Sequence, residues 1–337
     1  TMLARSGRGS VRANVASVIT RPQTIPTPVL YPIDAGGQRL IEWVSKEGGF
    51  VDDRLKCVQQ TPQSLCRGVL AVHSISEEEL REGAPLIAVP EKCYLTSDHA
   101  RQLLRSLKGG ASSNTVHVPS MAWVSASAGI GLPLTTGLSG PSSSQQEPST
   151  AFQVALLLAH ERSVKGPASF WWPYIDSLPA RPPNPWLMPD AELEAALAAV
   201  GPAAQEQWPK EVERARHAIH QQAEAAVRQY GKALGVDEQG VVWAAAQVLS
   251  RAFGSDTELG MAPLIDMCNH RAGADTPWGS EDVDGQPVSC ITSCHNGQPS
   301  ELLAGDELFI SYMARCSPLE AFLNFGFVPP ELMSKVK

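Results

Sequence analysis

The hydrophobic patterns along the chain are strand-like, then helical, then strand-like again, and this order limits the fold more than any other feature. The stretches 66–75 ("CRGVLAVHSI") and 83–90 ("GAPLIAVP") are short apolar runs bounded by turn residues, which is typical of strands. Strand signals return near the other end of the sequence, at 261–268, 287–294 and 306–313. Strands interrupted by helices in this way indicate one α+β domain that is rich in β-structure, rather than a row of separate domains.

The middle of the chain has helical periodicity. Residues 151–159 ("AFQVALLLA") predict a buried helix, and 190–201, 210–235 and 241–254 predict three more. An earlier helix is predicted at 39–49, with Gly48 and Gly49 as its stop. No apolar run approaches the roughly 20 residues of a membrane span, so no membrane partner is expected.

Charge and cysteine content exclude several classes of protein. The chain has 337 residues and a net charge of −8, which argues against broad binding to nucleic acid. Its seven cysteines are odd in number and scattered, so a disulfide framework is not expected. "CITSCH" (290–295) has the wrong spacing for a zinc knuckle and no second CxxC pair, so no metal site is predicted.

Two segments differ in composition from the rest. Residues 1–33 contain Arg5, Arg8, Arg12 and Arg21 but no acidic residue, which is typical of an organelle transit peptide. An ordinary disordered tail is the alternative. We therefore expect a chloroplast location, with the cytoplasm or nucleus as alternatives. Residues 109–149 are rich in Ser, Gly and Pro and predict a loop.

Three short motifs carry the chemistry of the sequence. They are "RGVLA" (67–71), "DMCNH" (266–270) and "GDELFISYMARCSPLEAFLNFGF" (305–327). Each motif alone is weak, since Asx and His residues commonly form turns after strands. In this order the motifs resemble those of the SET-domain methyltransferases, in the group that contains the Rubisco large-subunit lysine methyltransferase and the actin-histidine methyltransferase. "FWWPYIDSLP" (170–179) and "SRAF" (250–253) also resemble the helical insertion of that group.

The resemblance implies a definite fold. It predicts a β-rich SET domain with a pseudoknot, an exception to the rule against threaded chains. Residues 34–97 would form its N-terminal part, 98–246 the helical insertion and 247–330 its C-terminal part. The helical substrate-recognition domain that usually follows the "GF" motif in this group is expected to be absent from this chain.

The resemblance also implies a cofactor, S-adenosylmethionine (SAM), and a set of site residues. Arg67 and Arg251 would meet the cofactor, and Gly68 would let the backbone approach it. Asn269 would lie near its methionyl amine, and the backbone at His270 near its adenine. Asp266 would hold the loop or line the substrate entrance. The alternative for both arginines is an ordinary surface charge.

Tyr312 resembles the catalytic tyrosine of the group, with a core tyrosine as the alternative. Trp278 is the nearest match to an aromatic wall that contacts the substrate. One departure from the pattern is Ser317-Pro318, where the group usually has Ser-Asn.

The implied function is methyl transfer by in-line displacement from SAM to a lysine side chain of a non-histone protein. The protein partner would be the Rubisco large subunit or another plastid or cytosolic protein. Two alternatives stay open, namely a protein-histidine methyltransferase and a non-catalytic SET-like interaction protein.

Overall fold

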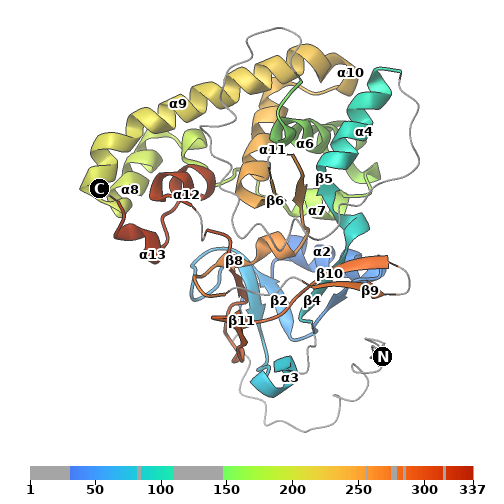
Figure 1. Cartoon of the computed structure of the whole chain (residues 1–337), viewed down its shortest axis with the longest axis vertical. Helices are drawn as coiled ribbons and strands as arrows, with labels where there is room; N and C mark the ends of the chain where they lie inside the picture. The colour runs from blue at the N-terminus through green and yellow to red at the C-terminus, as the bar shows by residue number, and fades with distance from the viewer. Residues whose placement is uncertain are drawn as a thin grey trace, which may run out of the picture.

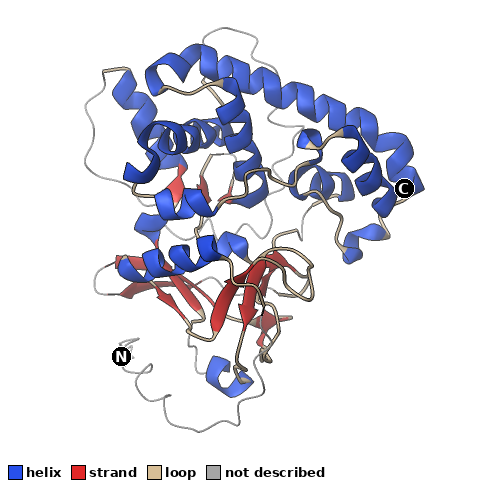
Figure 2. Cartoon of the chain, turned by 180° about the vertical axis from the view of Figure 1, so that it is seen from behind, coloured by secondary structure: helices blue, strands red, loops and turns tan. Residues whose placement is uncertain are grey.

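The computed structural model describes residues 31–81, 85–109, 147–255, 257–274, 279–283, 286–313 and 316–336. Figure 2 shows that the helices gather in one half of the molecule and most strands in the other. One buried apolar cluster runs through both halves, because it includes Leu40 and Ile87 beside the strands and Leu156 and Val248 among the helices. The described residues therefore share one core.

The main sheet joins strands from the two ends of the chain. Its order is β1–β4–β10–β9, and all neighbours are antiparallel. Ile87 of β4 pairs with Ile291 of β10, and the two strands lie side by side in Figure 1. The prediction of one β-rich domain interrupted by helices is therefore confirmed. The strands of this sheet are β1 (Phe50–Val51), β4 (Ile87–Pro90), β9 (Gly279–Val283) and β10 (Gln286–Ile291).

A second sheet repeats this pairing of distant segments. Leu95 of β5 pairs with Met261 of β7, and Met261 also pairs with Ala252 of β6. The order is thus β5–β7–β6, with one early strand beside two late ones. The bounds are β5 (Leu95–Thr96), β6 (Ala252–Gly254) and β7 (Leu259–Met261).

The segment that ends in β13 (Phe309–Ile310) runs between two earlier strands. Phe309 pairs in parallel with Asn269, in β8 (Asn269–His270). Just before it, Glu307 forms a bridge with Leu70 of β3 (Gly68–Ala71), which makes a hairpin with β2 (Leu55–Val58). This crossing is the one that the predicted pseudoknot requires. A small hairpin of β11 (Cys294–His295) and β12 (Gln298–Pro299) precedes it.

Helix α6 (Thr150–His160) is the centre of the helical half. Seven of its eleven residues are buried, and it packs against α4 (Ser97–Leu107) and α11 (Glu238–Arg251). The apolar run at 151–159 is therefore a buried helix, as predicted. In Figure 1 the long helix α9 crosses the top of this half. The remaining α-helices are α2 (Ala35–Lys46), α3 (Glu77–Arg81), α7 (Trp172–Ser177), α8 (Asp190–Val200), α9 (Pro202–Ala226), α10 (Lys232–Leu234), α12 (Pro318–Phe325) and α13 (Pro330–Met333).

Short helical turns connect these elements. Val227–Gly231 continues α9 as a π-helix, so the helix predicted at 210–235 is interrupted rather than uniform. The other π-helix is η2 (Glu161–Lys165), and the 3-10 helices are η1 (Glu91–Cys93), η3 (Gly166–Ala168), η4 (Pro185–Leu187) and η6 (Ile265–Met267). None of the described helices is both long and apolar enough to cross a membrane.

The predictions for 241–254 and 261–268 were wrong in part. The helix ends at Arg251, since Ala252 is already extended, with φ −76° and ψ 150°, and begins β6. Strand β7 ends at Met261, and the next residues turn into η6. Pro263 has no N–H for a sheet, and Leu264 has φ +70°, so a strand cannot continue through them.

One predicted domain boundary and two predicted segments can be compared with the described residues. Helix α11 runs across the boundary predicted between residues 246 and 247. Of the predicted leader, residues 1–30 lie outside the described residues, whereas Ile33 forms a bridge with Val58. Residues 110–146, most of the predicted Ser/Gly/Pro-rich loop, also lie outside the described residues.

Candidate functional site

A cavity of about 580 Å³ lies between the strand half and the helical half. Its walls come from the loop before β3, from the end of α11, from the η6–β8 segment and from the chain between β13 and the end of α12. The motifs that the sequence analysis singled out therefore meet in one place. The lining residues are Ser64, Cys66, Arg67, Pro179, Pro183, Ser250, Arg251, Ala252, Phe253, Asp266, Cys268, Asn269, His270, Ile310, Tyr312, Phe325, Gly326 and Phe327.

Asn269 is fixed by protein partners at the strand side of the cavity. Its Nδ2 donates to the carbonyl oxygen of Arg67 at 2.9 Å and to Oε1 of Glu307 at 2.5 Å. Both amide hydrogens are thus engaged, and only the amide oxygen is left to meet a ligand. The buried Glu307 carboxylate also accepts from the hydroxyls of Thr61 and Ser64, each at 2.7 Å.

Gly68 makes the contact between Asn269 and Glu307 possible. A Cβ at residue 68 would lie 2.5 Å from Glu307 Oε1 and 2.8 Å from Asn269 Nδ2. The sequence predicts a close approach of a ligand to the backbone at Gly68. In the structure the close approach is made by two protein side chains, because β3 and the Glu307 segment are neighbours.

His270 ties three segments together. Its Nδ1 accepts the backbone N–H of Tyr312 at 3.0 Å, so its Nε2 carries the hydrogen that faces Glu331 Oε1 at 2.7 Å. The side chain is 1% exposed. The imidazole therefore connects β8 with Tyr312, two residues after β13, and with helix α13.

Tyr312 follows β13 and lines the cavity. Its ring centre lies 5.0 Å from that of His270 and 5.1 Å from that of Phe325, so two rings hold its orientation. Burial raises the pKa of its hydroxyl. The group therefore stays neutral near pH 7 and can orient a ligand by hydrogen bonding, but it cannot serve as an anionic base.

Arg251 and Asp266 are two oppositely charged residues among those that line the cavity. Arg251 Nη1 lies 3.2 Å from the backbone oxygen of Asp266 and 3.7 Å from its Oδ2. The Asp266 side chain is fully buried, and its Oδ1 has no hydrogen-bond partner among the described residues. Burial raises the pKa of this carboxyl, while Arg251 and the hydroxyl of Tyr174 oppose the rise. Both roles predicted for Asp266, in holding the loop and at the substrate entrance, stay predictions.

Arg67 lines the cavity, but its guanidinium is bound by the protein. Nε forms an ion pair with Asp34, the residue that caps α2, and Nη1 donates to the carbonyl oxygen of Ser177 at the end of α7. These contacts connect β3 with both helices. The structure thus gives the Arg67 charge a partner that the sequence analysis did not predict.

Several solved structures are similar to this chain in fold. The structure of Rubisco LSMT bound to AdoMet matches 88% of this chain with a TM-score of 0.56 and 21% identity. Rubisco LSMT bound to sinefungin and monomethyllysine matches with a TM-score of 0.57 and 19% identity. The SET domain of LSMT bound to lysine and AdoHcy matches with a TM-score of 0.54 and 18% identity. This chain has a SET-domain fold. It spans 57% of the length of each of these three chains. No protein-family model and no curated protein matched the sequence.

Within this SET domain, the departure at Pro318 is accommodated by helix α12. Ser317 caps the helix and forms a reciprocal capping box with Glu320, and Pro318 occupies the first turn. Proline is favoured there, because the first N–H groups of a helix have no partner within it. The start of α12 is therefore stabilised by the cap at Ser317.

Two residues of the site were missed from the sequence. Tyr174 lies in the quoted "FWWPYIDSLP" motif, and Glu307 in "GDEL", yet neither motif by itself indicates a contact with Asp266 or Asn269. Trp278, predicted as a substrate contact, lies outside the described residues. All seven cysteines are free, and the described residues contain no cluster of three or more His, Cys, Asp or Glu side chains that could hold a metal ion.

Proposed function

We propose that this protein is a SAM-dependent protein methyltransferase that acts on a lysine side chain. The observation that carries this proposal is the cavity itself, which is lined by Arg251, Asn269 and Tyr312 together. The described neighbours with the same fold are bound to AdoMet, AdoHcy, lysine or monomethyllysine. Their ligands and the chemistry of this cavity agree.

The donor set fits the amino-acid end of SAM. That end carries an ammonium and a carboxylate, and the cavity is lined by the Arg251 guanidinium and by Asn269. Both amide hydrogens of Asn269 are engaged by the protein, which leaves its oxygen to meet a ligand. Arg251 would hold the carboxylate, and the Asn269 amide oxygen would accept from the ammonium. Pro179, Phe253, Phe325 and Phe327 give the same cavity an apolar surface for the rest of the cofactor.

When bound, SAM supplies a methyl group made electrophilic by the adjacent sulfonium. Tyr312 would use its neutral hydroxyl to orient the incoming amine and the reacting methyl. His270 would keep Tyr312 in place through the bond to its backbone N–H, and Phe325 would pack on the ring. The apolar walls would favour the neutral form of the lysine, because burial disfavours a charged amine.

The experiment that tests this function combines binding with product analysis. Calorimetry should detect SAM binding to the purified chain. Incubation with methyl-labelled SAM and a cell extract should label protein bands, and acid hydrolysis should release labelled methyllysine. Labelled methylhistidine would establish the histidine alternative. Failure to bind SAM would overturn the proposal, whereas binding without any labelled band would favour the interaction-protein alternative.

We also propose a plastid protein, other than a histone, as the acceptor. The Arg-rich, acid-free composition of residues 1–33 supports this location. Fusion of these residues to a fluorescent protein should direct it to chloroplasts. A diffuse cytoplasmic or nuclear signal would contradict the plastid location.

A further inference from the structure

Two buried side chains of the helical insertion are bonded to the C-terminal end of α12. Asn184 Nδ2 donates to the carbonyl oxygen of Asn324 at 2.8 Å, and Trp186 Nε1 donates to that of Leu323 at 3.2 Å. Asn184 is fully buried and Trp186 is 1% exposed. Because the last carbonyl groups of a helix have no partner within it, these two side chains complete the end of α12.

The backbone of the same segment packs on the residue that follows α12. Gly326 has φ +81°, and a Cβ there would lie 2.1 Å from the carbonyl oxygen of Pro183. The segment is anchored in turn by α9, since Arg216 Nε donates to the carbonyl oxygen of Trp186 at 3.1 Å. Figure 1 shows α12 beneath α9. The insertion therefore fixes this end of α12 through side chains and backbone together.

The end of α12 carries two aromatic rings of the cavity wall. Phe325 is the last residue of the helix and Phe327 follows soon after, and both line the cavity. The ring centre of Phe325 lies 5.1 Å from that of Tyr312, and Phe325 shares a buried cluster with Met313, against which Tyr312 packs. Such a close-packed cluster has no room for Phe325 to move alone. The position of the Tyr312 ring therefore depends on the position of this helix end.

From these contacts we propose that Asn184 and Trp186 are positioning residues, which hold the end of α12 so that Phe325 keeps the Tyr312 ring in place for methyl transfer. Neither side chain lines the cavity, so both act through the helix. The inference rests on the proposed function and deepens it, because it connects the helical insertion with the reacting centre. A displacement of about 1 Å is enough to lower a rate by about 10²-fold.

The first measurement needs neither cofactor nor substrate. Fluorotyrosine incorporated into the whole chain labels its five tyrosines, and Tyr312→Phe assigns the fluorine resonance of Tyr312. Trp186→Phe keeps an aromatic ring and removes only the N–H that faces Leu323. It should shift the Tyr312 resonance, because the field of the Phe325 ring at Tyr312 changes when the helix end moves. Asn184→Ala should shift the same resonance.

The second measurement is the rate of methyl transfer from saturating methyl-labelled SAM to the proteins of a heat-treated cell extract. Trp186→Phe and Asn184→Ala should each lower this rate roughly tenfold. In a Tyr312→Phe background the same changes should have almost no further effect, because the hydroxyl that they position is already absent. A merely structural role would lower the rate by the same factor in both backgrounds.

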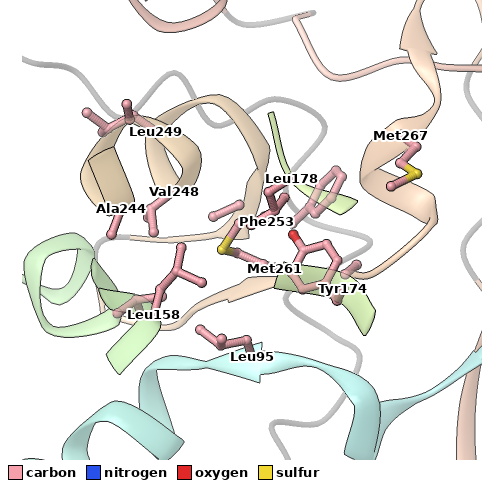
Figure 3. Close-up of a cluster of buried hydrophobic side chains, with 14 of the residues drawn as sticks. Leu95, Leu158, Tyr174, Leu178, Ala244, Val248, Leu249, Phe253, Met261 and Met267 are labelled. Carbon is pink, nitrogen blue, oxygen red and sulfur yellow. The ribbon is translucent and has the colours of Figure 1, made fainter. Parts of the chain in front are cut away.

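Trp243→Phe is the matched control. The Trp243 indole N–H also donates to a backbone carbonyl oxygen at 3.2 Å, that of Pro179, which keeps a second donor in Gln247. Trp243 belongs to α11, whose Ala244 and Val248 lie in the buried cluster that Figure 3 shows. This change should leave both the Tyr312 resonance and the rate as they are in the wild type.

The inference is wrong if folded Trp186→Phe keeps either the wild-type resonance or the wild-type rate. It is also wrong if the loss of rate is as large in the Tyr312→Phe background, or if Trp243→Phe has the same effects. Should Trp186→Phe not fold, Asn184→Ala decides by the same criteria. Absence of methyl transfer by the wild type would instead overturn the proposed function, and the resonance would still test whether the two side chains hold Tyr312.

Discussion

The two buried carboxylates near the cavity have different partners, and the difference predicts how much each one stabilises the fold. Glu307 is 1% exposed and accepts hydrogen bonds from Thr61, Ser64 and Asn269. The Asp266 side chain is equally buried, but one of its oxygens has no partner among the described residues. A carboxylate whose oxygens are both satisfied stabilises the fold, whereas one with an unsatisfied buried oxygen contributes less to its stability.

The largest expected effect tests the difference between the two carboxylates directly. Glu307→Ala should lower the free energy of unfolding by about 3 kcal/mol, because it removes the acceptor of the buried Thr61 hydroxyl and of the partly buried Ser64 and Asn269 side chains. Asp266→Ala should cost only about 1 kcal/mol, since it orphans one hydroxyl and removes an unsatisfied charge. Urea unfolding of both variants measures the difference. Equal losses of unfolding free energy would mean that the two carboxylates stabilise the fold equally.

Tyr312→Phe should affect turnover much more than cofactor affinity. Turnover should fall by roughly 10²-fold, because one preorganised polar group is removed from the reacting centre. SAM affinity should change little, since the groups proposed for its amino-acid end are those of Arg251 and Asn269. Single-turnover methyl transfer and calorimetry measure the two quantities. A variant with the full wild-type rate would show that Tyr312 only packs against His270 and Phe325.

Gly68→Ala should test the close packing beneath the strand end. The added methyl would meet Glu307 and Asn269, so the free energy of unfolding should fall by about 1–3 kcal/mol. Gly36→Ala is the matched control, because its Cβ would meet no atom closer than 3.5 Å. Thermal unfolding compares them. Similar midpoints for both variants would mean that the contact at residue 68 relaxes easily.

The smallest effect concerns the tie between His270 and α13. Glu331→Ala should lower the free energy of unfolding by about 1 kcal/mol or less, because the glutamate is partly exposed. Glu331→Gln keeps an acceptor for His270 Nε2 and should cost less still. SAM affinity should stay unchanged in both. A marked loss of affinity would show that α13 helps to shape the cavity.

Much of the fold was predictable from the sequence because periodicity reports which faces are apolar. The order of strands, helices and strands follows from the runs at 83–90, 151–159 and 287–294, and the structure pairs the first with the last. The motifs that contain Arg67, Asn269 and Tyr312 were also identified as parts of one site, and they line one cavity. Periodicity was enough to predict the order of the elements, whereas the grouping of the motifs into one site came from their resemblance to the SET-domain methyltransferases.

Partner choice was decided only by the tertiary structure. The sequence could not pair Glu307 with Thr61, because 246 residues separate them and a hydrogen bond between them depends on the register of β3 against the late strand. For the same reason the sequence could not predict that Arg67 pairs with Asp34 or that Tyr174 donates to Asp266. Nor could it predict that protein side chains occupy the space next to Gly68. Sequence patterns determine which residues can do chemistry, whereas long-range packing decides which of their atoms are left free to do it.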